Sequence, residues 1–434
     1  MILYCYKLIK KGVELMLKAF KYRIYPTKTQ IQLIEKHFGS TRFLYNYFLD
    51  YRQKEYAKGQ KVNYMTTQGK LTELKSQKEY EWLNECGSQS LQMALRELDN
   101  SYQRFFKQLG GYPNFKSKKN NHQSFTAPQN IKIENNKTYL PKFTKDGIKT
   151  KFHRDIPKDA ILKQATISRT NNQYFISILV DDNIPIPKPI KAKNAVGLDV
   201  GTETLITTSD YVKYPNLRHT KKYEQKLKKL QKALSKKQHS RKKGDTTPKS
   251  NNYLKQLKKV QKLHTKIYNS RKDYLNKISN EITNQYDIVC LESLNIKVMV
   301  KNKRLSKSIS DVAWSEFMRQ LEYKATWKGK TIIKISKWFP SSQICSNCGS
   351  STGKKPLNIR KFDCPECNTK NIDRDINASI NIRNYGLGQT DNRNSAGTVD
   401  YACGVSSSGV TTSYGIVTSY DTMKQEAQSS LAIG

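Results

Sequence analysis

The sequence predicts a multidomain protein with an α+β amino-terminal half and an α/β carboxyl-terminal half. Its 434 residues correspond to two to four domains at roughly 100 to 200 residues per domain. In the first half a strand, a helical segment and two hairpins follow one another, whereas strands and helices alternate after residue 195. Such alternation is typical of an α/β sheet, and the change of pattern indicates separate cores.

The charge balance indicates a nucleic-acid partner. Lys and Arg number 77 against 36 Asp and Glu, and the net charge of +41 would destabilise a compact state unless a polyanion neutralised it. With 36% apolar residues and 26 tyrosines, the chain is too apolar and aromatic to be a wholly disordered basic tail. Lysines interrupt the apolar residues among the first twenty, so no signal-peptide core is present there. No later run of apolar residues approaches the length of a membrane span. We expect a folded, cytoplasmic protein without membrane contact.

The amino-terminal half begins with a strand and continues with helices. Residues 17–25 have an apolar strand pattern, and Thr27 is a suitable N-cap for the helical pattern over residues 31–51. Because Gly39-Ser40 interrupts that pattern, we predict two short helices there. A second apolar stripe with helical spacing covers residues 91–109 and ends at two glycines.

Two hairpins follow, each with a pair of asparagines that favours a tight turn. One is centred on Asn135-Asn136 and the other on Asn171-Asn172. Together with the first strand they could close a small β-barrel into which the helices are inserted. The proline-rich residues 184–190 are stiff and short of backbone donors, so we predict a linker and a domain boundary near residue 190.

The carboxyl-terminal half reads as a sheet with long basic helices. Residues 195–208 predict its first hairpin, and residues 221–272 carry 19 Lys or Arg against two acidic residues, with apolar residues at helical spacing. Two helices should meet at Gly244 to Pro248, and their excess of 17 positive charges favours phosphate contact over a merely solvated face. The remaining predicted elements are strand 287–293, helix 314–327, strand 331–336 and helix 375–383. From Gly386 onward no apolar period persists, and we predict a disordered tail.

Four cysteines have the spacing of a zinc site. Cys345 and Cys348 form one C-x-x-C pair, and Cys364 and Cys367 form a second one, with fifteen residues between the pairs. Four thiolates would close the tetrahedral shell of one Zn²⁺ and leave no position for water. The predicted role is therefore structural, to hold a segment too small for a core of its own.

Three carboxylates form a second candidate site. Asp199 lies in the apolar run GLDVG, Glu292 ends the apolar run IVCLE, and Asp375 follows the last cysteine pair. A carboxylate in a buried strand is costly unless a cation meets it, and an ion pair could satisfy each one singly. Three carboxylates from separate elements favour Mg²⁺ or Mn²⁺, and two such ions can clamp the oxygens of a phosphodiester displacement.

These motifs resemble the RuvC-type nuclease half of TnpB proteins. Insertion sequences encode these proteins, which are relatives of type V CRISPR effectors. The amino-terminal half resembles the same family, so the likeness covers roughly residues 17 to 385. The motifs that carry it, in chain order, are YRIYPTKTQ, GSTRFLYNYFL, SQSLQMALRELDNSYQRFF, GYPNFKSKK, GLDVGTETLITTSD, IVCLESLNIKVM, LSKSISDVAWSEFMRQLEYKATWKGK, FPSSQICSNCG and CPECNTKNIDRDINASINI.

The resemblance implies an RNA-guided DNA endonuclease with an RNase H-like sheet holding Asp199, Glu292 and Asp375. Asp375 aligns with the family's metal ligand, and Asp373 is the alternative. After Asp199 this chain has GTETL where family members often have GIKDF. This difference lies outside the carboxylate set, so the expected activity is unchanged. Guide RNA and target DNA are the implied partners, in a monomeric ribonucleoprotein in which base pairing supplies the sequence. The implied location is the prokaryotic cytoplasm, in association with the nucleoid.

The resemblance also implies a domain order and three residues that read DNA. Tyr64, Gln92 and Thr126 match family positions near the duplex that flanks the target. The expected domains are an upstream extension (1–16), a wedge-like β-barrel (17–30 and 119–188), a helical recognition lobe (31–118), a RuvC-like nuclease (191–338 and 371–388), a zinc-ribbon insertion (339–370) and a disordered tail (389–434).

Two other functions are compatible with the same residues. An autonomous transposase could cut and join DNA with an RNase H-like triad and read DNA ends through its amino-terminal helices. The four-cysteine element between Glu292 and Asp375 instead follows the guided nucleases. A catalytically dead, RNA-guided DNA-binding regulator would not need the three carboxylates, which are all present in this chain.

Overall fold

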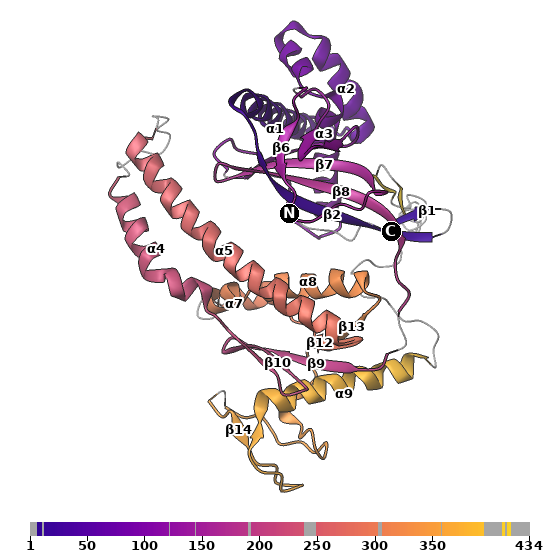
Figure 1. The fold of residues 1–434 in the computed structure, drawn as a ribbon, viewed down its shortest axis with the longest axis vertical. Helices are drawn as coiled ribbons and strands as arrows, with labels where there is room; N and C mark the ends of the chain where they lie inside the picture. Colours follow the sequence, from indigo (N-terminus) through magenta and orange to yellow (C-terminus); the bar gives the residue numbers. More distant parts are fainter. Residues whose placement is uncertain are drawn as a thin grey trace. The chain divides into compact units, whose positions relative to one another are not determined.

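The computed structural model of the chain separates into two units, residues 1–185 and residues 186–434. Figure 1 traces both, and each is described by itself. The structure describes residues 7–10, 13–120, 122–143, 145–189, 192–237, 249–302, 306–356, 358–394, 410–412 and 415–417.

The first unit is built on an eight-stranded sheet with helices inserted after its second strand. The strands are joined in the order β3-β7-β8-β2-β6-β5-β4, and β1 pairs with β2. This is an open path, so closure into a barrel stays a prediction. The elements are β1 (Lys7–Lys10), β2 (Val13–Tyr25), α1 (Lys28–Ala57), α2 (Tyr64–Ser76), η1 (Lys78–Glu85), α3 (Ser88–Phe106), β3 (His122–Ala127), β4 (Lys132–Glu134), β5 (Lys137–Tyr139), β6 (Ile148–Lys151), β7 (Ile161–Thr170) and β8 (Gln173–Pro185).

The asparagine turns are confirmed. Asn135 and Asn136 join β4 to β5 with φ of 48° and 58°, and Asn171 and Asn172 join β7 to β8 with φ of 51° and 62°. Two consecutive left-handed residues give the turn twist that matches antiparallel strands, and asparagine tolerates that conformation better than most residues. The predicted first strand is also present, but β2 begins at Val13, inside the segment that we expected to be an extension.

The prediction of two short helices over residues 31–51 is wrong, because α1 is one helix of 30 residues. Its first half buries Ile34 and Phe38 in the core of the sheet, and its second half buries Leu44 and Phe48 against α2 and α3. Gly39 costs the helix only about 1 kcal/mol relative to alanine. Burial on both sides of that glycine outweighs the cost, so the helix continues.

The apolar stripe over residues 91–109 is only partly buried. Leu91, Leu95 and Leu98 lie in the helical core, but α3 ends at Phe106, which is exposed, as is Leu109. The periodicity therefore predicted the packed face of the helix but overextended its end.

The second unit has a mixed α/β fold with a five-stranded sheet in the order β11-β10-β9-β12-β13. β9 runs antiparallel to β10 and parallel to β12, and β12 runs parallel to β13. The elements are β9 (Ala195–Val200), β10 (Thr204–Thr208), β11 (Lys213–Pro215), α4 (His219–Ser235), α5 (Asn251–Gln285), β12 (Ile288–Glu292), α6 (Ile296–Met299), α7 (Ser306–Val312), α8 (Trp314–Trp327), β13 (Thr331–Ile335), η2 (Ser341–Gln343), β14 (Lys361–Phe362), β15 (Ile372–Asp373), α9 (Arg374–Asn394), β16 (Val410–Thr412) and β17 (Gly415–Val417).

Helices cover both faces of this sheet (Figure 1). On one face, Leu198 and Leu291 pack with α5 and α8. On the other, Cys290, Ile333 and Ile335 pack with Ile382 of α9. Because side chains alternate along a strand, burial on both faces explains the nearly continuous apolar runs of β9 and β12.

The end of the second unit differs from the sequence prediction. α9 continues to Asn394, so residues 386–394 are helical although their sequence has no sustained apolar period. Beyond it, β16 and β17 pair with each other, and the rest of the predicted tail lies outside the described residues. Within the described ranges, no helix combines the length and the apolar character needed to cross a membrane.

Candidate functional site

Asp199 and Glu292 lie at the same level of the sheet and on the same face. Their parallel strands are paired up to Leu198 and Leu291, and each carboxylate is the next residue. Since side chains alternate, Asp199 shares its face with Gly197, and Glu292 shares its face with Cys290. Both carboxylates therefore face the side of the sheet that α9 covers.

α9 lies directly on this face because Gly197 has no side chain. A Cβ at Gly197 would come within 1.9 Å of the backbone oxygen of Ser379, and one at Gly386 would come within 2.6 Å of Cys290 Sγ. Because these two glycines have no side chains, helix α9 can approach strands β9 and β12 closely. The approach brings Asp375, in the first turn of α9, to the carboxylates of the strands.

The two aspartates of the DRD motif have different environments. Asp373 Oδ1 accepts hydrogen bonds from the backbone N–H groups of Asp375 and Ile376, at 3.1 Å each, and Oδ2 accepts from Lys213 Nζ at 2.6 Å. Burial raises the pKa of Asp373, but these hydrogen bonds outweigh burial and hold the pKa below its usual value. Asp375 contacts Arg360, with 3.5 Å between Nη1 and Oδ1.

The environment of Asp199 disfavours its charge. Burial, then repulsion from Glu292 and Asp375, raises the pKa of Asp199 to about 7, although nearby Arg374 opposes the shift. Burial also raises the pKa of Glu292, and a hydrogen bond from Ser341 Oγ to Glu292 Oε1, 2.8 Å long, acts in the opposite direction. Clustered carboxylates that repel one another in this way suit a divalent cation.

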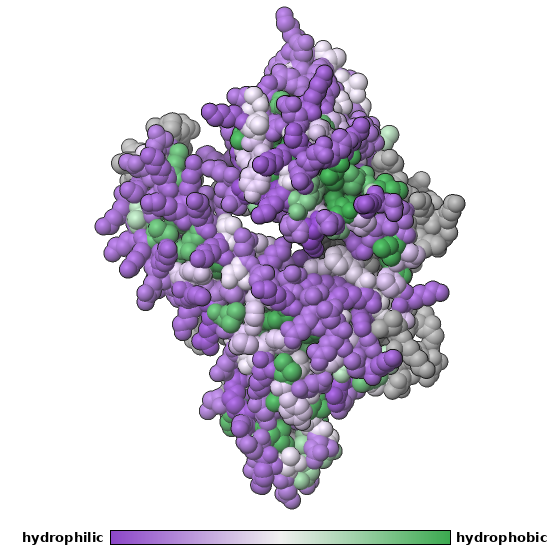
Figure 2. Space-filling model, in the orientation of Figure 1, coloured by the Kyte–Doolittle hydropathy of each residue, from purple (hydrophilic) through white to green (hydrophobic). Residues whose placement is uncertain are grey.

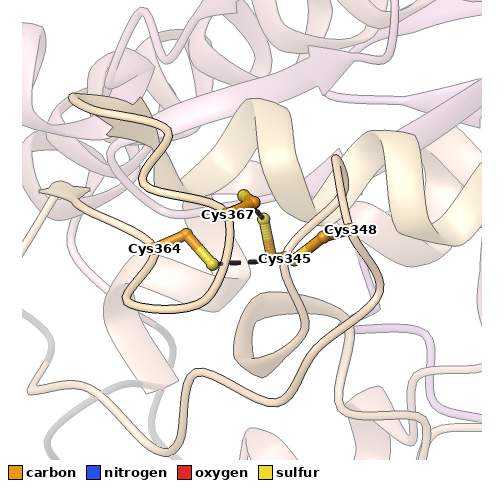
Figure 3. A group of neighbouring side chains, drawn as sticks. All are labelled: Cys345, Cys348, Cys364 and Cys367. Atoms are coloured by element: carbon orange, nitrogen blue, oxygen red, sulfur yellow. Dashed lines mark hydrogen bonds between the residues drawn. The ribbon is translucent and has the colours of Figure 1, made fainter.

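The four predicted cysteines come together in one cluster (Figure 3). The Sγ atoms of Cys345 and Cys367 are 3.8 Å apart, and those of Cys348 and Cys364 are 3.7 Å apart. A tetrahedron of sulfurs at about 2.3 Å from Zn²⁺ has edges of about 3.8 Å, so the donor set fits zinc. Of the described residues, only these four form a group of three or more His, Cys, Asp or Glu whose ligand atoms all lie within 4.8 Å. The three carboxylates are therefore spaced more widely.

Each C-x-x-C pair is followed directly by a residue with a left-handed backbone. Gly349 follows Cys348 with φ of 77°, and Asn368 follows Cys367 with φ of 55°. Glycine and asparagine are the residues that adopt this conformation at least cost. The turn returns the chain so that the N–H of Gly349 donates to the carbonyl of Cys345. Hydrogen bonds, chiefly from Thr369, lower the pKa of Cys367 to about 5, which favours the thiolate that a metal requires.

Sequence reasoning missed the residues that join the cysteine segment to the carboxylates. Asn377 and Asn381, one helical turn apart on α9, both donate through Nδ2 to the carbonyl of Ile344, at 2.7 and 2.8 Å. Arg374 donates to the carbonyl of Pro356 at 2.7 Å. The spacing of the two asparagines on one helix face was the available signal. The cysteine segment is thus fastened to the helix that carries Asp375.

The two predicted basic helices are α4 and α5, and their lysines are exposed. Tyr253, Val260 and Ile267 of α5 are buried, while the exposed lysines of both helices point outward, except that Lys266 lies over the ring of Tyr223. Figure 2 shows the surface of these helices, at the left, as predominantly hydrophilic. The connection at residues 238–248 lies outside the described residues.

The three predicted DNA-reading residues lie in the first unit and remain predictions. Tyr64 and Gln92 are partly buried on α2 and α3, and the Tyr64 hydroxyl accepts from Arg96 Nε at 3.1 Å. Thr126 on β3 is only 6% exposed, and its hydroxyl forms a hydrogen bond of 3.1 Å with that of Thr166.

Comparison with known protein families matches three segments. Residues 16–61 match the "Helix-turn-helix domain" of OrfB_IS605 proteins, and residues 175–303 match OrfB_IS605, "Probable transposase". Residues 314–382, which include the four cysteines, match "Cas12f1-like, TNB domain".

Similar proteins cover most of the chain. A "Putative RNA-guided DNA endonuclease" of Streptomyces pristinaespiralis is 35% identical over 372 residues, 85% of this chain and 89% of that protein. A "Putative RNA-guided DNA endonuclease InsQ" of Escherichia coli K12 is 30% identical over 384 residues, 84% of this chain and 91% of that protein. The "TnpB-like protein L79" of Acanthamoeba polyphaga mimivirus is 23% identical over 407 residues, 85% of this chain and 73% of that protein.

Among solved structures, a "Cas12f1-sgRNA-target DNA complex" is 16% identical and covers 85% of this chain and 99% of that chain. Its TM-score of 0.32 is too low to support an argument about this fold. The matched families and the cysteine cluster define an OrfB-type protein of the transposase-related class. The extent and identity of the first two relatives assign it further: the chain belongs to the TnpB family.

Proposed function

We propose that the chain is an RNA-guided, divalent-metal-dependent DNA endonuclease encoded by a transposable element, cutting next to a short flanking motif. The observation that carries the proposal is the convergence of Asp199, Glu292 and Asp375 on one side of the sheet in a protein of net charge +41. The two relatives of highest identity described above, whose names specify RNA-guided DNA endonucleases, support it. Acting on DNA, the complex would work at the nucleoid, as a monomeric ribonucleoprotein.

The sheet supports an RNase H-like, RuvC-type nuclease. The central strands β9 and β12 are parallel and carry Asp199 and Glu292 at neighbouring positions, while α9 brings Asp375 to the same face. Mg²⁺ or Mn²⁺ held by these carboxylates would supply charge for the attacking and leaving oxygens of a phosphodiester. Asp373 is less suited to the third position, because both of its oxygens already accept hydrogen bonds.

The chain's own residues keep the carboxylates in place. Ser341 orients Glu292 through its hydrogen bond, and Arg374 lowers the repulsion at Asp199. The cysteine cluster would hold Zn²⁺ in a closed shell and keep the segment that contains Ser341 and Arg360 near α9. Zinc would therefore act structurally.

The exposed lysines of α4 and α5 offer a surface for phosphates. Lys228 pairs with Glu224, but acidic residues on these helices are few. A guide RNA and its paired DNA strand would neutralise this charge, and base pairing would supply the sequence that the protein does not read.

The decisive experiment rewrites the guide. The RNA that copurifies with the protein is sequenced, and complexes with altered guide segments are tested for Mg²⁺-dependent cleavage on a panel of plasmids. We expect the cut site to follow the guide, and Asp199→Asn to abolish cutting while binding survives. Asp273→Asn, which removes an exposed carboxylate of α5, is the matched control and should cut normally.

Other outcomes favour the alternatives. A cut site that stays in place when the guide is rewritten, or cutting without RNA, would indicate an autonomous transposase. Guided binding by the unaltered protein without any cutting would indicate a DNA-binding regulator. Normal cutting by Asp199→Asn would end the assignment of the carboxylates.

A further inference from the structure

A highly exposed tryptophan follows β13, the strand next to the one that ends at the candidate carboxylate Glu292. Trp338 is 81% exposed, whereas Trp314, in the same unit, is 4% exposed. A single exposed apolar residue is ordinary on protein surfaces, so its exposure acquires meaning only from its surroundings.

The segment that carries Trp338 is held at both ends. The backbone N–H of Trp338 donates to Ser336 Oγ at 3.3 Å. The side chain of the next residue, Phe339, stacks on Tyr385 of α9 with 4.0 Å between ring centroids. Three residues after Trp338, Ser341 donates to Glu292. The tryptophan is therefore presented by a segment that is fixed to the sheet, to α9 and to a candidate catalytic carboxylate.

Trp338 lines an open hollow of about 620 Å³ at the carboxyl ends of β12 and β13. Its other walls include Ser293, directly after Glu292, and the polar side chains of Asn295 and Ser315. Lys337 also lines it, with Nζ 4.7 Å from the centroid of the Trp338 ring. This volume lies within the range of about 300 to 1,000 Å³ that is typical of small-ligand sites.

These groups suit one kind of ligand, an unpaired nucleotide. An indole face can stack on any base, but only where the base is not already stacked and paired in a duplex. A lysine whose Nζ lies over the ring can meet a phosphate adjacent to the stacked base, and polar side chains around the hollow can accept or donate hydrogen bonds to sugar or base.

We propose that Trp338 is a stacking platform for a base of the DNA strand being cut. With Lys337 on an adjacent phosphate, the stacked base would hold the unpaired strand so that one phosphodiester lies at Asp199, Glu292 and Asp375. The inference rests on the proposed function and adds to it a substrate-positioning contact that is separate from the carboxylates.

The test compares Trp338→Ala and Trp338→Tyr in the complete guide-RNA complex. We expect Trp338→Ala to raise the KM for a guided target about tenfold, and Trp338→Tyr, which keeps a stacking ring, to stay within about twofold of the parent. The control is Tyr211→Asn, which removes a ring that is 70% exposed at a position with φ of 65°, where asparagine fits; its KM should not change. Thermal unfolding should be nearly the same for all four proteins, because neither Trp338 nor Tyr211 is part of a core.

A second measurement identifies the base. Abasic sites are placed one at a time along the strand to be cut, and binding is measured in an Asp199→Ala background, so that the result does not depend on cleavage. When Trp338 is present, an abasic site at one position should weaken binding about as much as Trp338→Ala does. Trp338→Ala combined with that abasic site should weaken binding no more than either change alone.

The outcomes separate this inference from the proposed function. If Trp338→Ala binds and cuts like the parent, or if its effect adds fully to that of every abasic site, Trp338 is not the stacking platform and the nuclease assignment stands. If Asp199→Asn cuts normally, the nuclease assignment fails whatever Trp338 does.

Discussion

The carboxylate of Asp373 accepts a hydrogen bond from the backbone N–H of Asp375, with 3.1 Å between Oδ1 and N. This contact makes Asp373 the cap of α9 and leaves the side chain of Asp375, two residues later, outside the cap. The two aspartates of one short motif therefore have separate roles, one in helix initiation and one at the candidate metal site.

Substitution of the two aspartates should separate these roles. We expect Asp375→Asn to reduce Mg²⁺-dependent cleavage about 100-fold or more, since it removes a ligand, while target binding is retained. Asp373→Asn should keep cleavage within about tenfold, because asparagine also caps helices and the ion pair with Lys213 that it removes is worth only about 0–1 kcal/mol. Single-turnover cleavage assays measure both. The reverse ranking would move the third ligand to Asp373.

The cysteine cluster should hold one zinc per protein. We expect elemental analysis of Cys364→Ala to find almost none, and protease to cut the segment between Cys345 and Cys367 faster than in the parent, because the segment has little core of its own. Cys86→Ala, which alters a buried cysteine of the first unit, should retain the zinc. Active parent protein without stoichiometric zinc would contradict the assignment.

The contact of α9 with β9 should tolerate no side chain at Gly197. Gly197→Ala should destabilise the second unit by about 1–3 kcal/mol or more and impair cleavage, because its Cβ would collide with backbone of α9. The control is Gly388→Ala in α9, where nothing lies within 4 Å of the new Cβ. This substitution should stabilise the helix by roughly 0.5–1 kcal/mol. Thermal unfolding compares the pair. Equal melting temperatures would show that the helix does not sit on Gly197.

Lys324 should make the second unit more stable at alkaline pH. Burial, followed by repulsion from Lys328, lowers the pKa of Lys324 to about 8 in the folded protein, against 10.5 for the ordinary side chain. Between these values the unfolded chain holds the proton more tightly, so stability should rise with pH, by on the order of 3 kcal/mol in total, and should not vary below pH 8 through this group.

Unfolding of the RNA-free protein at pH 7.5 and pH 10 measures this effect. Lys324→Met should remove most of the difference between the two pH values, while Lys262→Met, on an exposed position of α5, should leave it unchanged. An unaltered pH difference in Lys324→Met would mean that its amine is already neutral or well solvated at neutral pH.

The lysines of α4 and α5 should contribute to RNA affinity through phosphates. Changing Lys226, Lys229, Lys255 and Lys258 together to glutamine should lower the salt dependence of RNA binding, by about 0.7 in the logarithmic slope for each single-strand phosphate that the variant no longer neutralises. The same four positions changed to arginine should keep the slope, because the charge is retained. Equal slopes for the glutamine variant and the parent would mean that these lysines face solvent only.

Local signals in the sequence were enough for several features. The asparagine pairs predicted both turns because the left-handed conformation they adopt is a property of the residues themselves. The paired C-x-x-C spacing likewise predicted the cysteine cluster, since each pair forms its own turn. Helix α8 has the predicted bounds, because its period and its ends are encoded within one short segment.

Other features depended on contacts between distant segments. The continuity of α1 through Gly39 was decided by two cores that bury opposite halves of the helix, which a local break signal cannot reveal. The helical end of α9, to Asn394, was likewise not visible in its apolar period.

The sequence by itself determined which residues carry charge, thiols and carboxylates, and hence the classes of chemistry open to this protein. The tertiary structure alone decided that Asp199 and Glu292 share one level and one face of the sheet, and that Gly197 lets α9 bring Asp375 to them. The physical reason is that strand register and helix approach depend on pairing and packing across more than 170 residues of chain. Residue identity is local, whereas a site made of several elements exists only once those elements have packed.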